Sequence, residues 1–101
     1  MLKLKEASLS KYRIFETHEF SKRMEKFTKR DATFIQKKLT SFVYPQISEE
    51  PYFGNNVKKL RGYYPDTWRY RIGRFRLFYC VDPKDAVIYI LTIDQRKDAY
   101  R

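Results

Sequence analysis

The sequence predicts a single α+β domain in which helices pack on one face of a small sheet. A length of 101 residues is typical of one domain with a modest core. Hydrophobic residues at 43% and aromatic residues at 18% favour a folded chain over a disordered one. The hydrophobic pattern runs from alternation to helical spacing and back to alternation, which predicts a strand, a helical hairpin and a three-stranded antiparallel meander. The domain spans residues 1–101, with residues 1–10 as an N-terminal extension.

The first strand is expected at residues 11–17, KYRIFET, where Tyr12 and Ile14 share one side. Thr17 is placed to cap a helix with Glu19 in its first turn. The apolar side of that helix follows at spacings of four and three: Phe20, Met24 and Phe27.

A second helix is expected over residues 29–44, because apolar residues recur there at spacings of three, four and three: Ala32, Ile35, Leu39 and Phe42. Pro45 is expected to stand close to its end. The two helices form the hairpin. Residues 45–65 contain prolines, glycines and paired asparagines, and this composition predicts a loop.

The last part of the chain predicts the meander. Residues 68–72 and 75–81 alternate in character, residues 82–85 (DPKD) predict a turn, and residues 86–94 are apolar on both sides. A strand that is apolar on both sides is typical of the interior of a sheet. About four strands are therefore expected, all antiparallel.

The segment RYRIGRFR, residues 69–76, fixes the register of the first hairpin. A two-residue turn with Gly73 at its first central position places Arg71 opposite Arg76. The aromatic and aliphatic residues then share the face toward the helices, and the remaining face carries Arg69, Arg71 and Arg76. Two arginines opposite each other repel, so an anion is expected to neutralise them.

Charge points to the kind of anion. The net charge is +10, and no acidic residue lies between Thr67 and Val81. Guanidinium groups match phosphate oxygens, so nucleic acid is the favoured partner. Arginines that only solubilise the outer face of a sheet are the alternative. A membrane partner is not expected, because the basic residues do not follow one side of a long amphipathic helix.

Several classes of site are not expected. Cys80 is the only cysteine and His18 the only histidine, so the chain has no metal-ligand cluster of the usual spacing and no intrachain disulfide. No apolar stretch approaches the length of a membrane span or a signal sequence. We expect a cytoplasmic protein without a metal, a small-molecule cofactor or a membrane anchor.

The motifs resemble the RelE/ParE toxin superfamily. KKLRGYYPDTWRYRIGRFRLFYCVDPKDAVIYILTIDQRKDAY looks like its C-terminal half, and KYRIFETHEFSKRMEKF resembles its opening strand and first helix. The resemblance covers residues 11–100. It implies a toxin of a type II toxin–antitoxin system, closer to the RelE branch, whose members cleave messenger RNA on the ribosome through attack by the 2′-hydroxyl. An acidic antitoxin is the implied protein partner, and ribosomal RNA contacts accompany the mRNA.

The resemblance also implies roles for single residues. Arg76 matches the arginine that steadies the transition state, Arg96 the arginine of the leaving group, and Tyr100 the C-terminal tyrosine. Arg69 and Arg71 stand where relatives often have lysines that bind RNA or assist as base. The residues expected to bind RNA are Arg69, Lys58, Lys59, Arg61, Arg74 and Phe78.

Two departures from the family pattern concern proton abstraction. Arg71 has too high an ordinary pKa to serve readily as a base, and Gln95 replaces the histidine that many relatives carry. Tyr100 is the better candidate base if Arg76 and Arg96 surround it. Two alternatives therefore remain beside the ribonuclease: a ParE-like inhibitor of DNA gyrase, and a catalytically silent RNA-binding relative.

Overall fold

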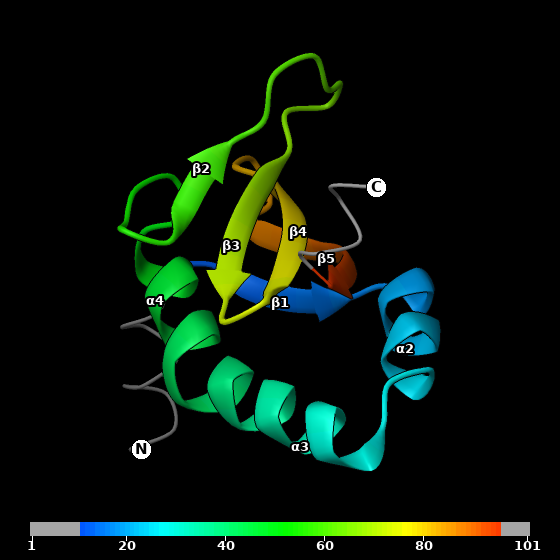
Figure 1. Ribbon diagram of the computed structural model, residues 1–101. Coiled ribbons are helices and arrows are strands. Elements are labelled where there is room, and N and C mark those ends of the chain that lie inside the picture. The colour runs from blue at the N-terminus through cyan, green and yellow to red at the C-terminus, as the bar shows by residue number, and fades with distance from the viewer. Residues whose placement is uncertain (1–10, 96–101) are drawn as a thin grey trace.

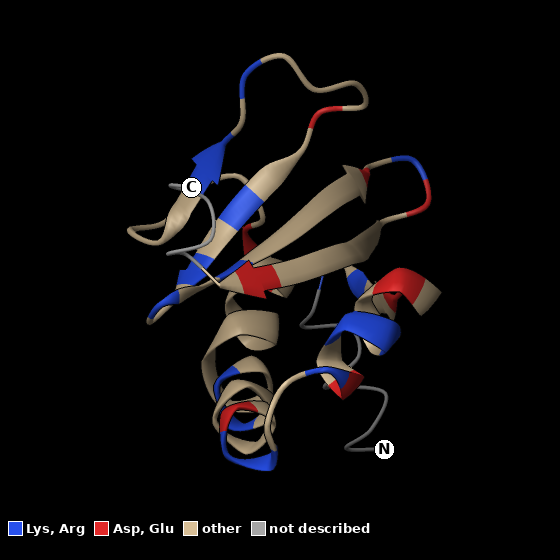
Figure 2. Cartoon of the chain, turned by 45° about the vertical axis from the view of Figure 1, so that its right-hand side comes forward, with Lys and Arg blue, Asp and Glu red and all other residues tan. Residues whose placement is uncertain are grey.

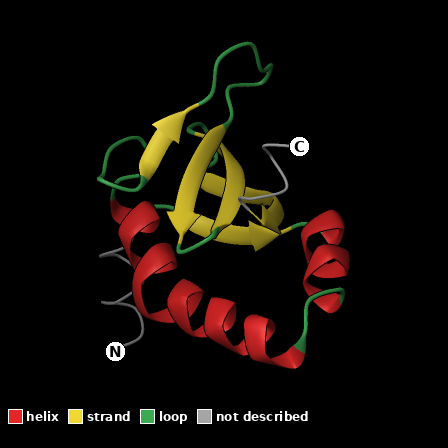
Figure 3. Ribbon diagram, viewed as in Figure 1, coloured by secondary structure: helices red, strands yellow, loops and turns green. Residues whose placement is uncertain are grey.

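The computed structural model describes residues 11–95, which form one five-stranded sheet with helices on one face (Figures 1 and 3). The strand order is β1-β5-β4-β3-β2. The strands are β1 (Arg13–Glu16), β2 (Val57–Lys59), β3 (Trp68–Ile72), β4 (Phe75–Asp82) and β5 (Val87–Gln95). The helical segments are α2 (His18–Glu25), α3 (Lys29–Lys38), η1 (Leu39–Val43) and α4 (Tyr44–Glu49). The predicted α+β class, with an N-terminal strand, a helical pair and a three-stranded meander, is confirmed.

The sheet differs from the prediction in two respects. It has five strands instead of about four, and β1 runs parallel to β5, with Ile14 beside Ile88. The helices return the chain to the far side of the sheet, and three antiparallel strands then bring β5 back beside β1. Alternation within a strand says nothing about the direction of its neighbour, so the sequence pattern could not supply this pairing.

Threonine caps begin both predicted helices. The Thr17 side chain accepts a hydrogen bond from the Phe20 amide at 3.2 Å, as expected, and its hydroxyl also donates to the Ile90 carbonyl of β5 at 2.7 Å. Thr28 accepts a bond from the Asp31 amide at 3.1 Å. Thr17 therefore both starts α2 and fastens it to the centre of the sheet.

The helical run continues past the expected end at residue 44, so the predicted loop from Pro45 onward is wrong there. Proline in an α-helix crowds the carbonyl four residues earlier, here that of Ser41. The chain forms the wider π-helical turn η1 directly before Pro45, and α4 then continues to Glu49. This turn shifts the inward face to Val43 and Ile47, whereas Phe42 is 59% exposed instead of lying in the core.

Strand β2 also lies within the predicted loop. Val57 pairs with Tyr70 and Lys58 with Arg69, so β2 extends the sheet beyond β3. A strand of three residues next to two asparagines is too short to show an alternation of apolar and polar residues. The strand exists because the edge of β3 supplies hydrogen-bonding partners.

The β3–β4 hairpin has the predicted register. Arg71 faces Arg76 and Ile72 faces Phe75 across a turn in which Gly73 has a φ of +58°. The side chains toward the helices are buried: Tyr70, Ile72, Phe75, Leu77 and Tyr79. They pack on Phe20, Ile35, Leu39, Val43 and Ile47 from the helical layer, and β5 adds Ile88, Ile90 and Ile93. The core therefore lies between the helices and one face of the sheet, and no helix of residues 11–95 covers the other face. No helix among residues 11–95 is long and apolar enough to cross a membrane.

Candidate nucleic-acid interface

The face of the sheet away from the helices carries a row of cross-strand neighbours. Lys58 of β2, Arg69 of β3 and Phe78 of β4 lie side by side in successive strands. Blue segments on β2 and β3 mark the basic positions in Figure 2. Neighbours in such a row point to the same face, so two cations and an aromatic ring are presented together. Below, this set together with Arg71 and Arg76 is called the arginine face.

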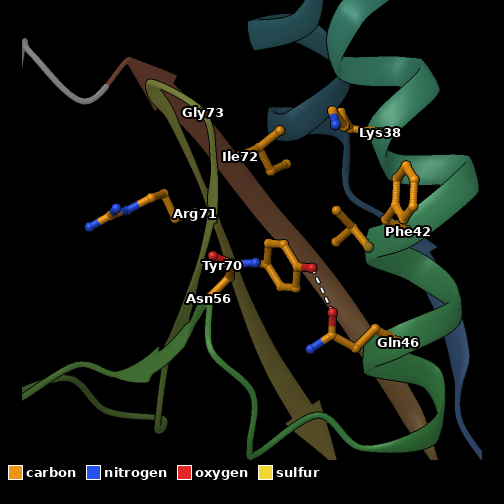
Figure 4. Close-up of a pocket in the computed structure, with 9 residues that line it drawn as sticks. Lys38, Phe42, Gln46, Asn56, Tyr70, Arg71, Ile72 and Gly73 are labelled. Atoms are coloured by element: carbon orange, nitrogen blue, oxygen red, sulfur yellow. Dashed lines mark hydrogen bonds between the residues drawn. The ribbon is translucent and has the colours of Figure 1, made fainter.

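Arg71 is an exposed member of the arginine face, close to the hairpin turn. Its side chain points away from the helices, opposite to that of Tyr70 (Figure 4). Arg69, two residues earlier on the same side of β3, is half-buried. The geometry therefore confirms the predicted side of the strand for both arginines and leaves the role of each as a proposal.

Arg76 has a carboxylate partner that local sequence reasoning missed. Its Nε donates to Oδ1 of Asp94 and its Nη2 donates to Oδ2, each at 3.1 Å. The two side chains are 25% and 26% exposed, and their residues face each other across β4 and β5. The expectation that an external anion neutralises Arg76 is thus corrected, because Asp94 already does so. The pairing of residues 86–94 with residues 75–81 is the sequence signal that could have revealed it.

The Phe78 ring also contacts Arg76. The guanidinium carbon lies 5.2 Å from the ring centroid, within the range of a cation–π interaction. Asp94 and Phe78 together hold the guanidinium plane in one orientation. Arg76 is therefore a fixed donor group next to the freer Arg71.

The other predicted residues lie elsewhere. Arg74 turns toward the helical side, where its Nη2 bonds to Asp31 at 3.2 Å beside a hollow of about 600 Å³. Lys59 alternates with Lys58 and pairs with Asp66 at 3.3 Å. Arg61 is exposed in the loop between β2 and β3. Arg96 and Tyr100, which the resemblance places in the catalytic set, lie outside the described residues.

A groove opens next to the arginine face, between β3 and the helical run (Figure 4). Its volume is about 410 Å³, and Arg71, Ile72 and Tyr70 form the strand side. Lys38, Phe42 and Gln46 form the helical side, and the Tyr70 hydroxyl donates to the Gln46 side-chain oxygen at 2.6 Å. Sequence reasoning missed this groove because it assigned Phe42 to the core.

An aromatic stripe follows the outer side of α3 and η1. Phe34 is 41% exposed and Phe42 59%, and the Lys38 ammonium lies 5.8 and 5.0 Å from their ring centroids. Large apolar side chains beside a cation on an open surface are typical of a protein-binding surface. The stripe is continuous with the groove through Lys38 and Phe42.

The cysteine, the histidine and the carboxylates of residues 11–95 give no sign of a nucleophile or a metal site. Burial, with a smaller effect of Asp82, raises the pKa of the Cys80 thiol, so its thiolate is scarce at neutral pH. His18 is exposed at the first position of α2. Within residues 11–95, no three His, Cys, Asp or Glu side chains gather in a way that could hold a metal ion.

Comparisons with known proteins find one matching family model and several solved structures of similar fold. The sequence model described as the ParE toxin of the type II toxin–antitoxin system parDE matches residues 17–100. The chain is 27% identical to a chain of the RelE–RelB complex from Pyrococcus horikoshii, with a TM-score of 0.63 over 85% of this chain and 96% of that one. It is 25% identical to a chain of the RelBE2 toxin–antitoxin complex from Mycobacterium tuberculosis, with a TM-score of 0.66 over 84% and 98%. The isolated E. coli toxin RelE shares the fold at 23% identity, with a TM-score of 0.60 over 83% of each chain. No curated protein sequence matches the chain.

Proposed function

The chain belongs to the ParE toxin family of type II toxin–antitoxin systems, and from its arginine face and its likeness to RelE chains we propose that it is a toxin that cleaves messenger RNA on the ribosome. The observation that carries the proposal is the arginine face, where Lys58, Arg69 and Phe78 form one row next to Arg71. Cations bind the phosphates of an RNA strand, and an aromatic ring stacks on an unpaired base. Single-stranded RNA offers both groups at once.

Strand scission needs three contributions from the protein. The 2′-oxygen loses its proton and attacks the adjacent phosphorus, negative charge grows on the phosphoryl oxygens, and the 5′-oxygen leaves with a proton. Arg71 and the oriented Arg76 are suited to the second contribution, because they lie opposite each other on adjacent strands. The resemblance links Arg96 to the leaving group and Tyr100 to activation or stacking, and the role of Tyr100 as base follows from the positive charge expected around it.

The partner that silences the toxin is proposed to be an acidic antitoxin that covers the arginine face and the adjacent groove. Arg71 borders both, and Lys38 lies between the exposed rings of Phe34 and Phe42. An antitoxin segment that presents carboxylates beside apolar side chains complements this combination. The two relatives of 25% and 27% identity were solved as RelB–RelE complexes, which supports a protein partner of this kind.

The test is induction of the chain without antitoxin, followed by mapping of mRNA ends on ribosomes. Arg71→Ala is expected to reduce the cleavage rate at least tenfold, since it removes one of the proposed contacts to the reacting phosphate. Lys84→Ala in the turn after β4 removes the same charge from an exposed position outside the arginine face and is expected to cleave normally. Equal cleavage by Arg71→Ala and the parent chain would contradict the proposal.

Inhibition of DNA gyrase is the second candidate, because the matching family is that of ParE toxins. It predicts growth arrest with intact mRNA and a loss of supercoiling activity when the purified chain is added to gyrase. The ribonuclease predicts cut mRNA and unaffected supercoiling. The two measurements on the same preparation separate the candidates.

A further inference from the structure

The loop between β2 and β3 presents two tyrosines that neither the core nor the arginine face uses. Tyr64 is 99% exposed and Tyr63 57% exposed, at residues 60–66, which we name the tyrosine loop. The loop projects past the end of the sheet in Figure 1. A large ring that is wholly in water contributes nothing to the stability of the core. Two adjacent rings of this kind are available for contact with a ligand.

The base of the tyrosine loop is closed by three interactions. The Leu60 amide donates to the Thr67 carbonyl at 2.9 Å, and the Thr67 hydroxyl donates to the Pro65 carbonyl at 3.0 Å. Lys59 and Asp66 form an ion pair of 3.3 Å across the same base. Because the two ends are tied together, the rings are presented on a partly ordered support, which lowers the entropy lost on binding.

The surroundings of the two rings are basic. A hollow of about 420 Å³ lies beside the loop, lined by Lys59, Leu60, Arg61, Gly62, Tyr63 and Asp66. Asp66 is the one acid of residues 60–66, and it is already paired with Lys59. Arg61 therefore gives the hollow a positive group beside an aromatic wall, a combination that suits a base and its phosphate.

The loop is also continuous with the arginine face. Strand β2 leads directly into it, and Lys58 of β2 stands in the row with Arg69 and Phe78. An RNA strand that crosses the row to Lys58 and then turns along β2 reaches residues 60–66, because β2 ends at Lys59. We infer that the tyrosine loop is a second RNA-binding site, in which Tyr63 and Tyr64 stack on unpaired bases flanking the segment held by the arginine face.

This inference rests on the proposed action on RNA, although its test does not require cleavage. The probe is a fluorescein-labelled 2′-O-methyl RNA of 12 uridines, on the order of the strand length that one small basic domain covers, which 2′-hydroxyl attack cannot cut. Anisotropy measures its affinity for the full chain. Tyr64→Ala is expected to weaken binding about tenfold through loss of stacking, and Tyr64→Phe, which keeps the ring, is expected to bind like the parent.

Two controls make the result specific. Phe53→Ala removes another exposed ring, 72% accessible, that lies outside both proposed sites, and it is expected to leave affinity unchanged. An abasic oligomer with the same backbone is expected to bind the parent and Tyr64→Ala equally, because it offers no base for stacking. Circular dichroism checks that each variant is folded.

The outcomes separate this inference from the proposed function. Unchanged affinity of both Tyr64→Ala and Tyr63→Ala for the uridine probe would overturn the inference, even if Arg71→Ala abolishes mRNA cleavage. Weaker binding of these variants to gyrase or to the antitoxin, with unchanged RNA affinity, would overturn it as well and assign the loop to a protein partner. Loss of RNA affinity in the variants supports the loop site, including the case in which the parent chain cuts no mRNA.

Discussion

Arg76 lies between a positively charged neighbour on one strand and a negatively charged neighbour on the other. Arg71 faces it from β3, and Asp94 faces it from β5 with two hydrogen bonds of 3.1 Å. A repulsive cross-strand pair costs a fraction of a kcal/mol, whereas a partly buried, bidentate pair contributes more. Asp94 therefore permits two arginines to stand together without an external ligand. The pair also neutralises part of the positive charge of the arginine face.

Asp94→Asn is expected to lower the free energy of unfolding by about 1–2 kcal/mol, because Arg76 loses a charged acceptor and Arg71 remains opposite it. Urea unfolding followed by circular dichroism measures the change. Asp85→Asn, the same substitution at an exposed turn position, is expected to change little. A double-mutant cycle with Arg76→Gln isolates the interaction, and the absence of coupling between the two positions would refute this account.

Tyr79 is a second residue whose environment decides a measurable property. Its ring is fully buried and its hydroxyl donates to the Pro51 carbonyl at 2.6 Å. Burial first, and then the nearby Tyr70 and acidic groups, raise the pKa of this phenol above its ordinary value. The folded chain therefore keeps the phenolic proton to higher pH than the unfolded chain does.

The sign of the pH dependence follows from that difference. Below about pH 10 the Tyr79 phenol keeps its proton in both the folded and the unfolded chain, so its contribution to stability is fully present. Above about pH 10 the phenol of the unfolded chain ionises first, and the stability of the folded chain falls as pH rises. Tyr79→Phe is expected to lose about 1–2 kcal/mol at pH 8. Its deficit relative to the parent should shrink by about 1 kcal/mol between pH 10 and 11. Urea midpoints at these pH values test this, with Tyr64→Phe as the exposed control; a constant deficit would refute it.

At the scale of elements, the sequence predicted those whose signals are local. Gly73 marks the turn, and alternation on both sides of it fixes which residues of β3 and β4 face the helices. Thr17 likewise marks the start of α2. These features depend on residues close to one another in the chain, so their prediction was accurate.

The elements that were missed depend on distant or compensating structure. Pro45 is a sound signal for the end of an α-helix, but the π-helical turn η1 accommodates it and α4 follows. Strand β2 exists through its pairing with β3. Asp94 is 18 residues from Arg76 along the chain and adjacent to it across the sheet. The sequence therefore predicted the side of the sheet on which Arg69, Arg71 and Arg76 lie, but not the Asp94 carboxylate or the groove.

The hairpin turn gives a test at this scale. Gly73→Ala is expected to destabilise the chain by about 1–2 kcal/mol, because a φ of +58° is unfavourable for a residue with a Cβ. The added Cβ would lie 3.6 Å from the Phe34 ring, an ordinary contact, so the cost arises from the backbone. Gly73→Asn should lose less, since asparagine tolerates positive φ better. Equal thermal stability of the parent and the alanine variant would contradict the expected strain.

At the scale of the whole molecule, the helical layer covers one face of the sheet and leaves the other uncovered (Figure 3). The net charge of +10 raises the local concentration of any polyanion around the protein. Long-range attraction of this kind does not select a site. In the proposed complex with RNA, the arginine face adds contacts through charge and the tyrosine loop adds contacts through stacking. The salt dependence of binding distinguishes these two contributions.

The affinity of the full chain for the 2′-O-methyl uridine RNA is expected to fall linearly with salt on a double-logarithmic plot, because bound phosphates release counterions. Arg71→Ala removes one phosphate contact, so the slope should become shallower by about 0.7. Asp94→Asn removes the carboxylate that neutralises Arg76, so the contact of Arg76 with a phosphate should release one more counterion and steepen the slope by about the same amount. Tyr64→Ala removes a neutral ring, so it should lower affinity at every salt concentration and leave the slope unchanged.

Anisotropy titrations between 50 and 200 mM salt, on the order of the physiological range, measure the slopes of all three variants. A slope for Arg71→Ala equal to that of the control Lys84→Ala would show that the arginine face does not touch the RNA backbone.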